Sequence, residues 1–438
     1  MASQITPPRG MRDFLPADKR RRERILGTIR EVYTRHGFDE IETPVVEDAA
    51  RLHSGLGGDN EKLSFAVMKR ALDAEALAAA AEAGDPLALS DLGLRFDLTV
   101  PLARFVATHR GTLPGVFRSL QMAPVWRAER PQKGRYRQFV QCDIDIIGEP
   151  GALAEVELLV ASSAALVELG LDNCTIRVND RRLLTALLVH CGFAETEHGA
   201  ALITIDKLDK IGPEGVAAEL ATLNATAALQ LAAALATWAP LLETGIRLDR
   251  ETVLTSLPGA LREDPAVVEV VEGMVEIADA AFAAGASIRL VFDPSLVRGM
   301  GYYTGTIFEA AHPESGSSVG GGGRYDGMIG RFLGQDVPAC GFSIGFERIV
   351  DLAQLPDSGD ERAVALLFDK RASIADIAKV KGAVVRSGAS RVRVAKKPKN
   401  VRGLLASLAE QGFTHVAHVR DEHVAAPETL SFEALQGS

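Results

Sequence analysis

Hydrophobic and polar residues recur along this chain with the two periods that helices and strands impose, and changes of period mark its elements. From Arg21 to Tyr33 apolar residues repeat at helical spacing, and Gly37 ends the predicted helix. The next stretch, FDEIETPVVE at residues 38–47, alternates like a strand that Pro44 interrupts. The chain is therefore predicted to begin with a helix that leads into a broken strand.

The following region combines strands, a short helix and a long hairpin. Residues 63–96 are strand-like at both ends, and the alanine-rich residues 71–86 between them predict a helix. Residues 121–126 and 139–147 are predicted strands on either side of RAERPQKGRYRQ. That segment is expected to connect an antiparallel hairpin, with Gly134 near its tip.

Helical patterns dominate the middle of the chain. One helix is predicted at about 152–169 and another from Arg181, with the strand TIRVND between them. Residues 195–285 are almost wholly helical by pattern, and we expect them to form a helical insertion. Strand patterns then resume in three segments: SIRLVFD, YYTGTIFEAA, and ACGFSIGFERIVDLA, which ends in a helix.

A compositional break, PDSGDER at residues 356–362, is read as a linker. Beyond it ALLFD, RVRVA and HVAHV alternate with helical stretches, which predicts a small α/β domain over residues 363–438. Residues 1–355 predict an α+β domain with an antiparallel sheet, flanking helices and the helical insertion.

Composition places the chain among globular proteins of two or three domains, since 438 residues are 47% hydrophobic and 24% charged. No apolar run approaches the roughly 20 residues that span a bilayer, and the first residues lack the apolar core of a signal peptide. The four cysteines are scattered, which predicts neither a disulfide framework nor a zinc site. We expect a cytoplasmic protein without a membrane partner.

Charge is unevenly distributed along the chain. Residues 361–420 carry 13 Lys/Arg and 4 Asp/Glu, a net charge of +9 in a chain whose total is −10. A basic module on an acidic body indicates a polyanionic partner met at one end. Basic surface domains without a nucleic acid partner are also common, so the charge alone does not decide.

A second basic segment lies in the predicted hairpin connection. RAERPQKGRYRQF, residues 127–139, holds five Lys/Arg and one carboxylate. A solvated surface loop would explain such a run. A site for phosphate groups would explain it too, because guanidinium groups stay charged and bind phosphate oxygens as a planar fork.

Three separated stretches resemble, in order and spacing, the three motifs of class II aminoacyl-tRNA synthetases: GTIREVYTRHGFDEIETP, the arginine-rich hairpin, and GFSIGFERI. RGMRDFLP, LRFDLTVPLARFVA, FRSLQMAPVWRAERPQKGRYRQFVQCDIDIIG and LVRGMGYYTGTIFE further resemble the histidyl-tRNA synthetase family. The resemblance covers residues 6–355 well and the remainder poorly. It implies the class II synthetase-type sheet, ATP-dependent activation of L-histidine, and transfer of histidine to the 3′ end of tRNA(His).

The resemblance implies residues that bind ATP, which the family uses with Mg²⁺ and without a metal site fixed by the protein alone. Arg127 matches the arginine on the α-phosphate. Arg135 and Arg348 match arginines that hold the terminal phosphates. Glu129 matches the position that contacts adenine, and Phe139 matches the ring stacked beneath it.

Arg298 is the second predicted catalytic residue beside Arg127. It matches an arginine that the family places against the α-phosphate, in a role that other class II enzymes give to a metal ion. Without the resemblance, an arginine next to Gly299 would be expected to pair with a surface carboxylate.

A histidine pocket needs an acceptor for the α-ammonium group and partners for both ring nitrogens. Asp97, Thr99 and Gln141 match the family's α-ammonium contacts, and Asp145 and Tyr303 match its imidazole contacts. The complete predicted set is Asp97, Thr99, Arg127, Gln141, Asp145, Arg298, Tyr302, Tyr303 and Tyr325. Outside the resemblance, strand packing would explain the tyrosines and a surface charge would explain Asp145.

The run Gly320–Gly323 lacks the Lys-Ser/Thr of a phosphate loop and is not expected to lead straight into a helix. The resemblance favours a tight backbone turn above the amino-acid pocket, with Tyr325 pointing inward. The outer part of the arginine-rich loop is expected to meet the tRNA acceptor end through Arg130, Gln132 and Lys133.

The first motif implies a homodimer, and residues 363–438 correspond to a divergent form of the family's anticodon-binding domain. Because that domain is the weak part of the match, a paralogue that activates histidine for an acceptor other than tRNA stays open. A non-catalytic histidine sensor, like the regulatory subunit of ATP phosphoribosyltransferase, is disfavoured by the retained RPQKGRYRQF.

Overall fold

The computed structural model describes residues 5–53, 63–131, 134–297, 302–355, 362–369 and 371–435. The chain divides into two compact units. The larger holds residues 24–354 with the segment up to residue 13, and the smaller holds residues 355–438, grouped with residues 14–23.

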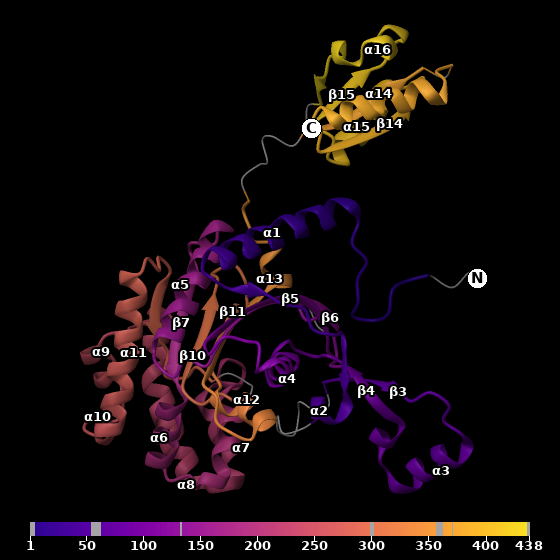
Figure 1. The fold of residues 1–438 in the computed structure, drawn as a ribbon. Helices are drawn as coiled ribbons and strands as arrows, with labels where there is room; N and C mark the ends of the chain where they lie inside the picture. Colours follow the sequence, from indigo (N-terminus) through magenta and orange to yellow (C-terminus); the bar gives the residue numbers. More distant parts are fainter. Residues whose placement is uncertain are drawn as a thin grey trace. The chain divides into compact units, whose positions relative to one another are not determined.

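A nine-stranded sheet forms the centre of the larger unit, in the order β1-β5-β6-β12-β11-β10-β7-β9-β8 (Figure 1). Within the described part of the chain its pairs are antiparallel except β1–β5 and β7–β9. Its strands are β1 (Asp39–Glu40), β5 (Phe117–Trp126), β6 (Gln138–Ile147), β7 (Thr175–Asp180), β8 (Ile246–Arg247), β9 (Arg289–Phe292), β10 (Thr306–Ala311), β11 (Ser318–Arg324) and β12 (Ala339–Gly345). The predicted α+β fold with an antiparallel sheet is confirmed.

The arginine-rich segment connects the hairpin that the alternation predicted. β5 and β6 pair over ten residues each, from Phe117–Ile147 to Trp126–Gln138. Gly134 in the connection has φ 77°, a left-handed conformation that glycine adopts without strain. Both strands are longer than their alternating patterns indicated.

Helices cover the sheet of the larger unit. α1 (Pro16–Arg35) buries Ile25, Ile29 and Val32, the apolar residues at helical spacing. α5 (Leu153–Glu168) packs on β12 and is itself covered by α11 (Pro265–Ala283). α13 (Phe346–Ile349) directly follows β12 and carries Arg348, as predicted.

Two helices that the alternation did not predict form the core around the site. α4 (Thr99–His109) and α12 (Asp326–Leu333) pack together, and their apolar faces share one cluster with Phe117 and Ile147. α4 was missed because four consecutive residues near its start, Val100, Pro101, Leu102 and Ala103, are buried, which obscures the helical period there.

The interpretation of Gly320–Gly323 as a tight turn is wrong. These glycines lie within β11, paired with β10 and β12. Glycine is required there because a Cβ at Gly322 would lie 1.9 Å from the carbonyl oxygen of Gly341. The run does not lead straight into a helix, since Arg324 and Tyr325 separate it from α12, which begins at Asp326.

Residues 195–285 are mostly helical, with one strand that the pattern did not reveal. Their elements are a 3₁₀ turn (Glu195–Glu197), α7 (His198–Ile205), α8 (Leu208–Thr244), α9 (Arg250–Ser256), α10 (Gly259–Arg262), α11 and the edge strand β8. They follow α6 (Arg181–Cys191), against which α8 packs. The backbone of α8 leaves helical geometry at Gly212 and Asn224.

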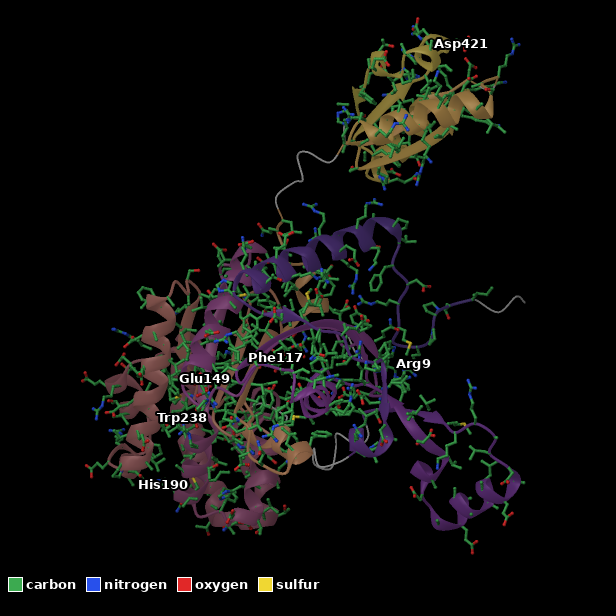
Figure 2. The ribbon with its side chains drawn as sticks, in the orientation of Figure 1. Arg9, Phe117, Glu149, His190, Trp238 and Asp421 are labelled. Atoms are coloured by element: carbon green, nitrogen blue, oxygen red, sulfur yellow. The ribbon has the colours of Figure 1, made fainter. Side chains whose placement is uncertain are left out.

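One stretch of α8, Lys210–Trp238, is long and apolar enough by length and composition to cross a membrane. The expectation that no run approaches that length is therefore wrong for this helix. Of its large apolar side chains, Leu231, Leu235 and Trp238 are buried, whereas Leu223 and Leu229 are exposed. Trp238 also donates from Nε1 to the carbonyl oxygen of Ser256 at 2.7 Å (Figure 2).

A separate three-stranded sheet with order β2-β4-β3 extends from the larger unit (Figure 1). It contains β2 (Val46–Asp48), β3 (Phe65–Met68) and β4 (Ser90–Leu94), with α2 (Ala49–His53) beside it. The alanine-rich segment forms α3 (Ala74–Ala83), as predicted, and a 3₁₀ turn (Pro86–Leu89) follows.

The smaller unit is a four-stranded sheet with order β14-β13-β15-β16. Its strands are β13 (Ala363–Phe368), β14 (Arg391–Lys396), β15 (His415–His418) and β16 (Glu433–Ala434). Its helices are α14 (Ile374–Arg386), α15 (Val401–Glu410) and α16 (Asp421–Ala425), followed by a 3₁₀ turn (Pro427–Thr429). β13, β14 and β15 are parallel and β13 is buried on both faces, so the predicted α/β architecture is confirmed.

Candidate active site

One face of the large sheet carries a row of polar side chains from a single strand. Gln141, Asp143 and Asp145 alternate along β6 and therefore project from the same face. Residues directly paired across an antiparallel ladder share that face. These neighbours are Ala123, Gln121 and Ser119 on β5, and Gly345, Ser343 and Gly341 on β12.

Asp145 is fixed in this row by Tyr325, whose hydroxyl donates a hydrogen bond to Oδ1 at 2.5 Å. The carboxyl group lies over Gly341, where a Cβ would come within 1.9 Å of Oδ1, so this position requires glycine. Burial raises the pKa of Asp145 to about 7, the Tyr325 hydrogen bond lowers it, and nearby Asp97 raises it. A donor placed beside Asp145 would stabilise the ionised form.

Asp97 is a second buried carboxylate in the same site, close enough to raise the pKa of both Asp143 and Asp145. Its Oδ1 accepts from the backbone N–H of Val100 at 3.1 Å, at the start of α4. Burial raises the pKa of Asp97 to about 6, while the Val100 bond and Arg127 lower it.

Three buried oxygens in this site have no hydrogen-bond partner among the described residues: Asp97 Oδ2, Gln141 Oε1 and Ser119 Oγ, of which the first two can only accept. The amide nitrogen of Gln141, in contrast, donates to Asp143 Oδ2 at 3.2 Å. Buried polar atoms are almost always paired in folded proteins. Two unpaired acceptors, one of them a carboxylate oxygen, therefore indicate a ligand that brings a charged donor.

Three tyrosine rings form an aromatic wall beside the carboxylates. The Tyr302 ring centroid lies 4.8 Å from that of Tyr303 and 5.8 Å from that of Tyr325. All three rings contact the apolar cluster of α4 and α12. The wall and Asp145 together suit a flat, polar-edged ring.

Arg127 lies at the junction between the pocket and the hairpin connection. Its Nε donates to the carbonyl oxygen of Phe96 at 3.0 Å, and its guanidinium lies 5.1 Å from the Phe139 ring centroid. It lowers the pKa of Asp97 and Asp143, so its positive charge reaches the buried carboxylates. The predicted ATP residues Arg127 and Phe139 are thus brought together.

The remaining predicted phosphate and adenine residues lie further along the connection and beyond β12. Arg135 and Glu129 are exposed and form an ion pair with each other, Nη1 to Oε2 at 4.0 Å. Arg130 is exposed. Arg348 donates to the backbone oxygen of Ser318 and to its Oγ at 3.1 Å, which fixes its guanidinium beside β11.

Thr99 is the first residue of α4, and its backbone N–H bonds to Asp97. Three predicted residues lie outside the described part of the chain: Arg298, Gln132 and Lys133. Their roles stay predictions.

The sequence patterns missed several residues that complete the site. Asp143 and Ser343 support Gln141, and Glu347 accepts a hydrogen bond from the backbone of Val140 at 3.3 Å. Asp143 could have been found from strand periodicity, because it lies two residues from both Gln141 and Asp145.

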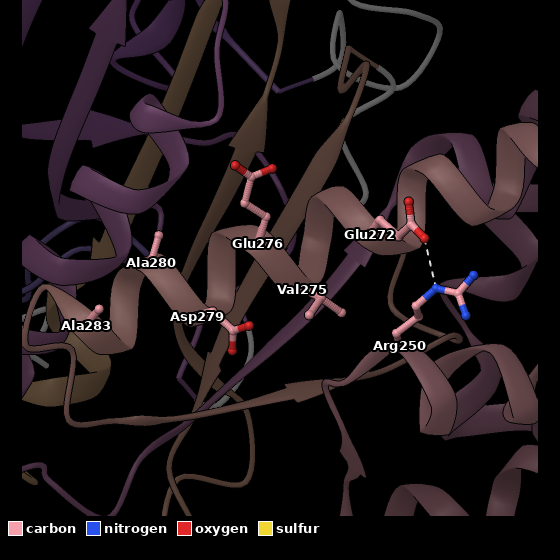
Figure 3. A pocket seen from close by; sticks show the side chains of 7 residues that line it. All are labelled: Arg250, Glu272, Val275, Glu276, Asp279, Ala280 and Ala283. Carbon is pink, nitrogen blue, oxygen red and sulfur yellow. Dashed lines mark hydrogen bonds and ion pairs between the residues drawn. The ribbon is translucent and has the colours of Figure 1, made fainter.

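Among the described residues, no group of three or more His, Cys, Asp or Glu side chains is arranged to hold a metal ion. A groove on α11 lies in the helical insertion, lined by Glu272, Glu276 and Asp279 (Figure 3). In it Arg250 donates to Glu272 at 2.8 Å. None of its lining residues belongs to the predicted site.

Comparison with known proteins identifies a family whose members this chain resembles. Residues 10–349 match the family model described as histidyl-tRNA synthetase. The chain is 61% identical over 420 residues to a histidine–tRNA ligase of Leifsonia xyli subsp. xyli, covering 96% of each chain. It is 37% identical over 417 residues to that of Rhodopirellula baltica, covering 92% of this chain and 88% of the relative.

Two solved structures share the fold. A histidyl-tRNA synthetase from Nostoc sp. PCC 7120 superposes with a TM-score of 0.75 at 24% identity, covering 98% of this chain and 97% of that one. A protein from Bacillus halodurans C, described as an ATP phosphoribosyltransferase regulatory subunit/histidyl-tRNA synthetase, gives a TM-score of 0.72 at 21% identity over 95% of this chain and 99% of that one.

Proposed function

Since the chain belongs to the histidyl-tRNA synthetase family, we propose that it activates L-histidine with ATP and transfers the histidyl group to the 3′ end of tRNA(His). The observation that carries this proposal is the pair of unpaired buried acceptors, Asp97 Oδ2 and Gln141 Oε1, beside the Asp145–Tyr325 pair. An amino acid with a cationic amino group and a ring N–H has the donors that these acceptors lack.

Histidine binds with its α-ammonium group on Asp97 and Gln141, where Thr99 lies at the start of α4. Its imidazole ring lies along the tyrosine wall, with one ring N–H directed at Asp145. Tyr303 supplies the partner of the other ring nitrogen. Each buried polar group then has a partner. An amino acid that lacks the ring nitrogens offers no hydrogen-bond donor to Asp145 and therefore binds weakly.

Activation joins a histidine carboxylate oxygen to the α-phosphorus of ATP, and the bond from that phosphorus to the bridging oxygen of pyrophosphate breaks. Little proton transfer is required, so positioning and charge stabilisation provide the catalysis. Arg127 stabilises the charge on the α-phosphate from its fixed place beside Phe96 and Phe139. Arg298 acts on the same phosphate.

The rest of the nucleotide lies along the hairpin connection. Phe139 stacks beneath the adenine ring and Glu129 contacts its edge. Arg135 and Arg348 hold the terminal phosphates. Arg135 exchanges its ion pair with Glu129 for a phosphate, which costs little because both side chains are exposed.

Mg²⁺ accompanies ATP. We infer that the metal is held mainly by phosphate oxygens and water, as Mg²⁺ commonly is. When bound it neutralises phosphate charge. Glu347, which is nearly buried and next to Arg348, would contribute a carboxylate to the metal's water shell.

Transfer to tRNA uses the outer loop and the smaller unit. Arg130, Gln132 and Lys133 meet the acceptor end, and the basic residues of 363–438 contact the anticodon arm. We further propose that the chain is a homodimer formed through α1 and the strand after it, and that it acts in the cytoplasm without a membrane partner.

The proposal is tested by two successive assays on the purified protein. Pyrophosphate exchange into ATP should require L-histidine and should not respond to the other amino acids, and tRNA(His) should then become charged. Exchange without charging would favour a non-tRNA acceptor. Histidine binding without exchange would favour a sensor. Absence of both would contradict the pocket assignment.

A further inference from the structure

We propose that Asp143 is a positioning residue, whose side chain holds the Gln141 amide so that the amide oxygen faces the amino group of the bound amino acid. This inference rests on the proposed function for the identity of the ligand. It concerns a residue that acts through Gln141 and not by direct contact with histidine or ATP.

The hydrogen bonds of Gln141 support the assignment. Its Nε2 lies 3.2 Å and 3.5 Å from the two carboxyl oxygens of Asp143, and 3.4 Å from Ser343 Oγ. Its Oε1 is buried and has no partner among the described residues. Among the described residues, the amide therefore makes its hydrogen bonds through its nitrogen, which leaves the oxygen for a ligand.

An amide side chain can turn by 180° about its last bond, and only its hydrogen-bond network decides between the two orientations. The reversed orientation would direct Oε1 at the oxygens of Asp143 and Nε2 at the ligand's ammonium group. The first contact would place acceptor oxygens against each other, and the second would place two donors against each other, so neither could form a hydrogen bond. Asp143 therefore selects the orientation that can accept from a cation.

The neighbours of Asp143 leave it free for this task. It is 5% exposed and lies between Gln141 and Asp145 on β6. Across the ladder, Gln121 donates to the carbonyl oxygen of Leu98 at 3.1 Å. Ser343, on the other side, bonds to the Asp143 carboxyl group.

To hold the Gln141 amide nitrogen, Asp143 needs an oxygen that accepts a hydrogen bond, and it does not need a negative charge. Burial raises the pKa of Asp143 well above its usual range, nearby Asp145 and Asp97 raise it further, and Ser343 and Arg127 lower it. A neutral carboxyl group keeps a carbonyl oxygen that accepts from Gln141, and it selects the same amide orientation when its O–H points away from Gln141. An asparagine at this position would preserve that acceptor and a valine would remove it, while valine still fits a buried strand.

The main variants are Asp143→Val and Asp143→Asn, each tested in histidine-dependent pyrophosphate exchange. Asp143→Val should raise the histidine KM about 10-fold, the effect of one lost hydrogen bond to a charged group. Its kcat and its KM for ATP should stay within about 2-fold. Asp143→Asn should stay within about 3-fold of the unmodified protein in all three constants.

A double-mutant cycle separates action through Gln141 from a general structural effect. Gln141→Ala removes the amide, so adding Asp143→Val to it should raise the histidine KM by less than about 2-fold. If the two substitutions act independently, so that their fold-changes in the histidine KM multiply, the proposal is overturned. If Asp143→Val fails to fold, Asp143→Ser provides the same cycle, because its shorter side chain does not reach Nε2.

Two competitive ligands complete the test through binding alone. Histamine keeps the amino group, and 3-(imidazol-4-yl)propionate lacks it. Asp143→Val should weaken histamine binding about 10-fold and leave the propionate within about 2-fold. Equal weakening of both would overturn the positioning role. If the unmodified protein binds both ligands without supporting exchange, only the proposed function fails.

Discussion

At the scale of single residues, the site is organised by carboxyl groups that the fold holds against their solvation preference. Asp97, Asp143 and Asp145 are each 5% exposed or less, and the positive charge of Arg127 acts on Asp97 and Asp143. Burial raises the pKa of all three. In the free protein this arrangement costs stability, and a bound cation offsets that cost.

The pH dependence of stability should reveal this cost at Asp145. Its folded pKa of about 7 lies above the unfolded value, so its contribution to stability is present below about pH 4 and lost as pH rises through 7. Asp145→Asn removes the ionisable group while keeping an acceptor for Tyr325. At pH 8 the ligand-free variant should be more stable to unfolding by about 1–3 kcal/mol.

The measurement is denaturant unfolding of both proteins at pH 8 and pH 4.5, without histidine. The stability difference should shrink at the lower pH, where the folded carboxyl group is already protonated. The same difference at both pH values would show that Asp145 does not titrate near neutrality.

The sequence identified the residues expected to contact histidine, and it missed the residues that hold those side chains in place. Asp97, Gln141, Asp145 and Tyr325, chosen by their place in family motifs, lie in one site. Asp143 was passed over because a carboxylate on a strand gives no sign of which neighbour it holds. Strand periodicity could have placed Asp143 on the same face as Gln141 and Asp145, but the hydrogen bond itself appears only in the structure.

At the scale of elements, the N-terminal strap, residues 8–12, holds the arginine-rich connection. Arg12 pairs with the Glu347 carboxylate, and its guanidinium carbon lies 3.4 Å from the Tyr136 ring centroid. The backbone N–H of Arg137 donates to the carbonyl oxygen of Gly10 at 2.8 Å. The strap thus connects the hairpin to α13, the two elements that carry the predicted phosphate residues.

Arg12→Ala should therefore weaken ATP binding more than histidine binding. Loss of the ion pair leaves the nearly buried Glu347 without this partner and releases Tyr136. We expect a rise of about 3–10-fold in the ATP KM, with the histidine KM within about 2-fold. Exchange kinetics with each substrate varied in turn measure both constants.

Arg9→Ala is the matched control, because Arg9 is an exposed arginine of the same strap (Figure 2). It should leave both constants near those of the unmodified protein. Equal effects of the two variants, or a larger effect of Arg12→Ala on histidine, would contradict the role of the strap.

Elements with a strong period of apolar residues could be predicted from the sequence. Elements with a run of consecutive buried residues, or composed of glycines, could not. β5 and β6 were found from their alternation. α4 was not, since consecutive buried residues near its start obscure its period, and β11 was read as a turn because four consecutive glycines carry no side-chain pattern. Its strand conformation is imposed by pairing with β10 and β12.

At the scale of the whole molecule, the two compact units have separate cores and opposite net charges. The smaller one has its own apolar clusters on both faces of β13. Residues 361–420 carry +9 in a chain of −10. Binding of a nucleic acid through such a module releases counterions, so it should weaken steeply as salt rises.

A chain that ends after residue 358 should keep histidine-dependent exchange, because every residue predicted for activation precedes it. Its KM for tRNA should rise, and the dependence of that KM on salt should become shallower. Charging assays at several salt concentrations, beside the full chain, measure both. An unchanged KM and salt slope would exclude the smaller unit as a tRNA-binding domain.

The central claim is that Asp97 Oδ2 and Gln141 Oε1, which have no partner among the described residues, accept from the amino group of histidine. A crystal structure of the protein with L-histidine tests it most directly. The account predicts the α-ammonium nitrogen within about 3.2 Å of both oxygens, and a ring nitrogen at the same range from Asp145. Histidine bound with its ammonium group away from these oxygens, or with its ring beside Asp97, would contradict the account.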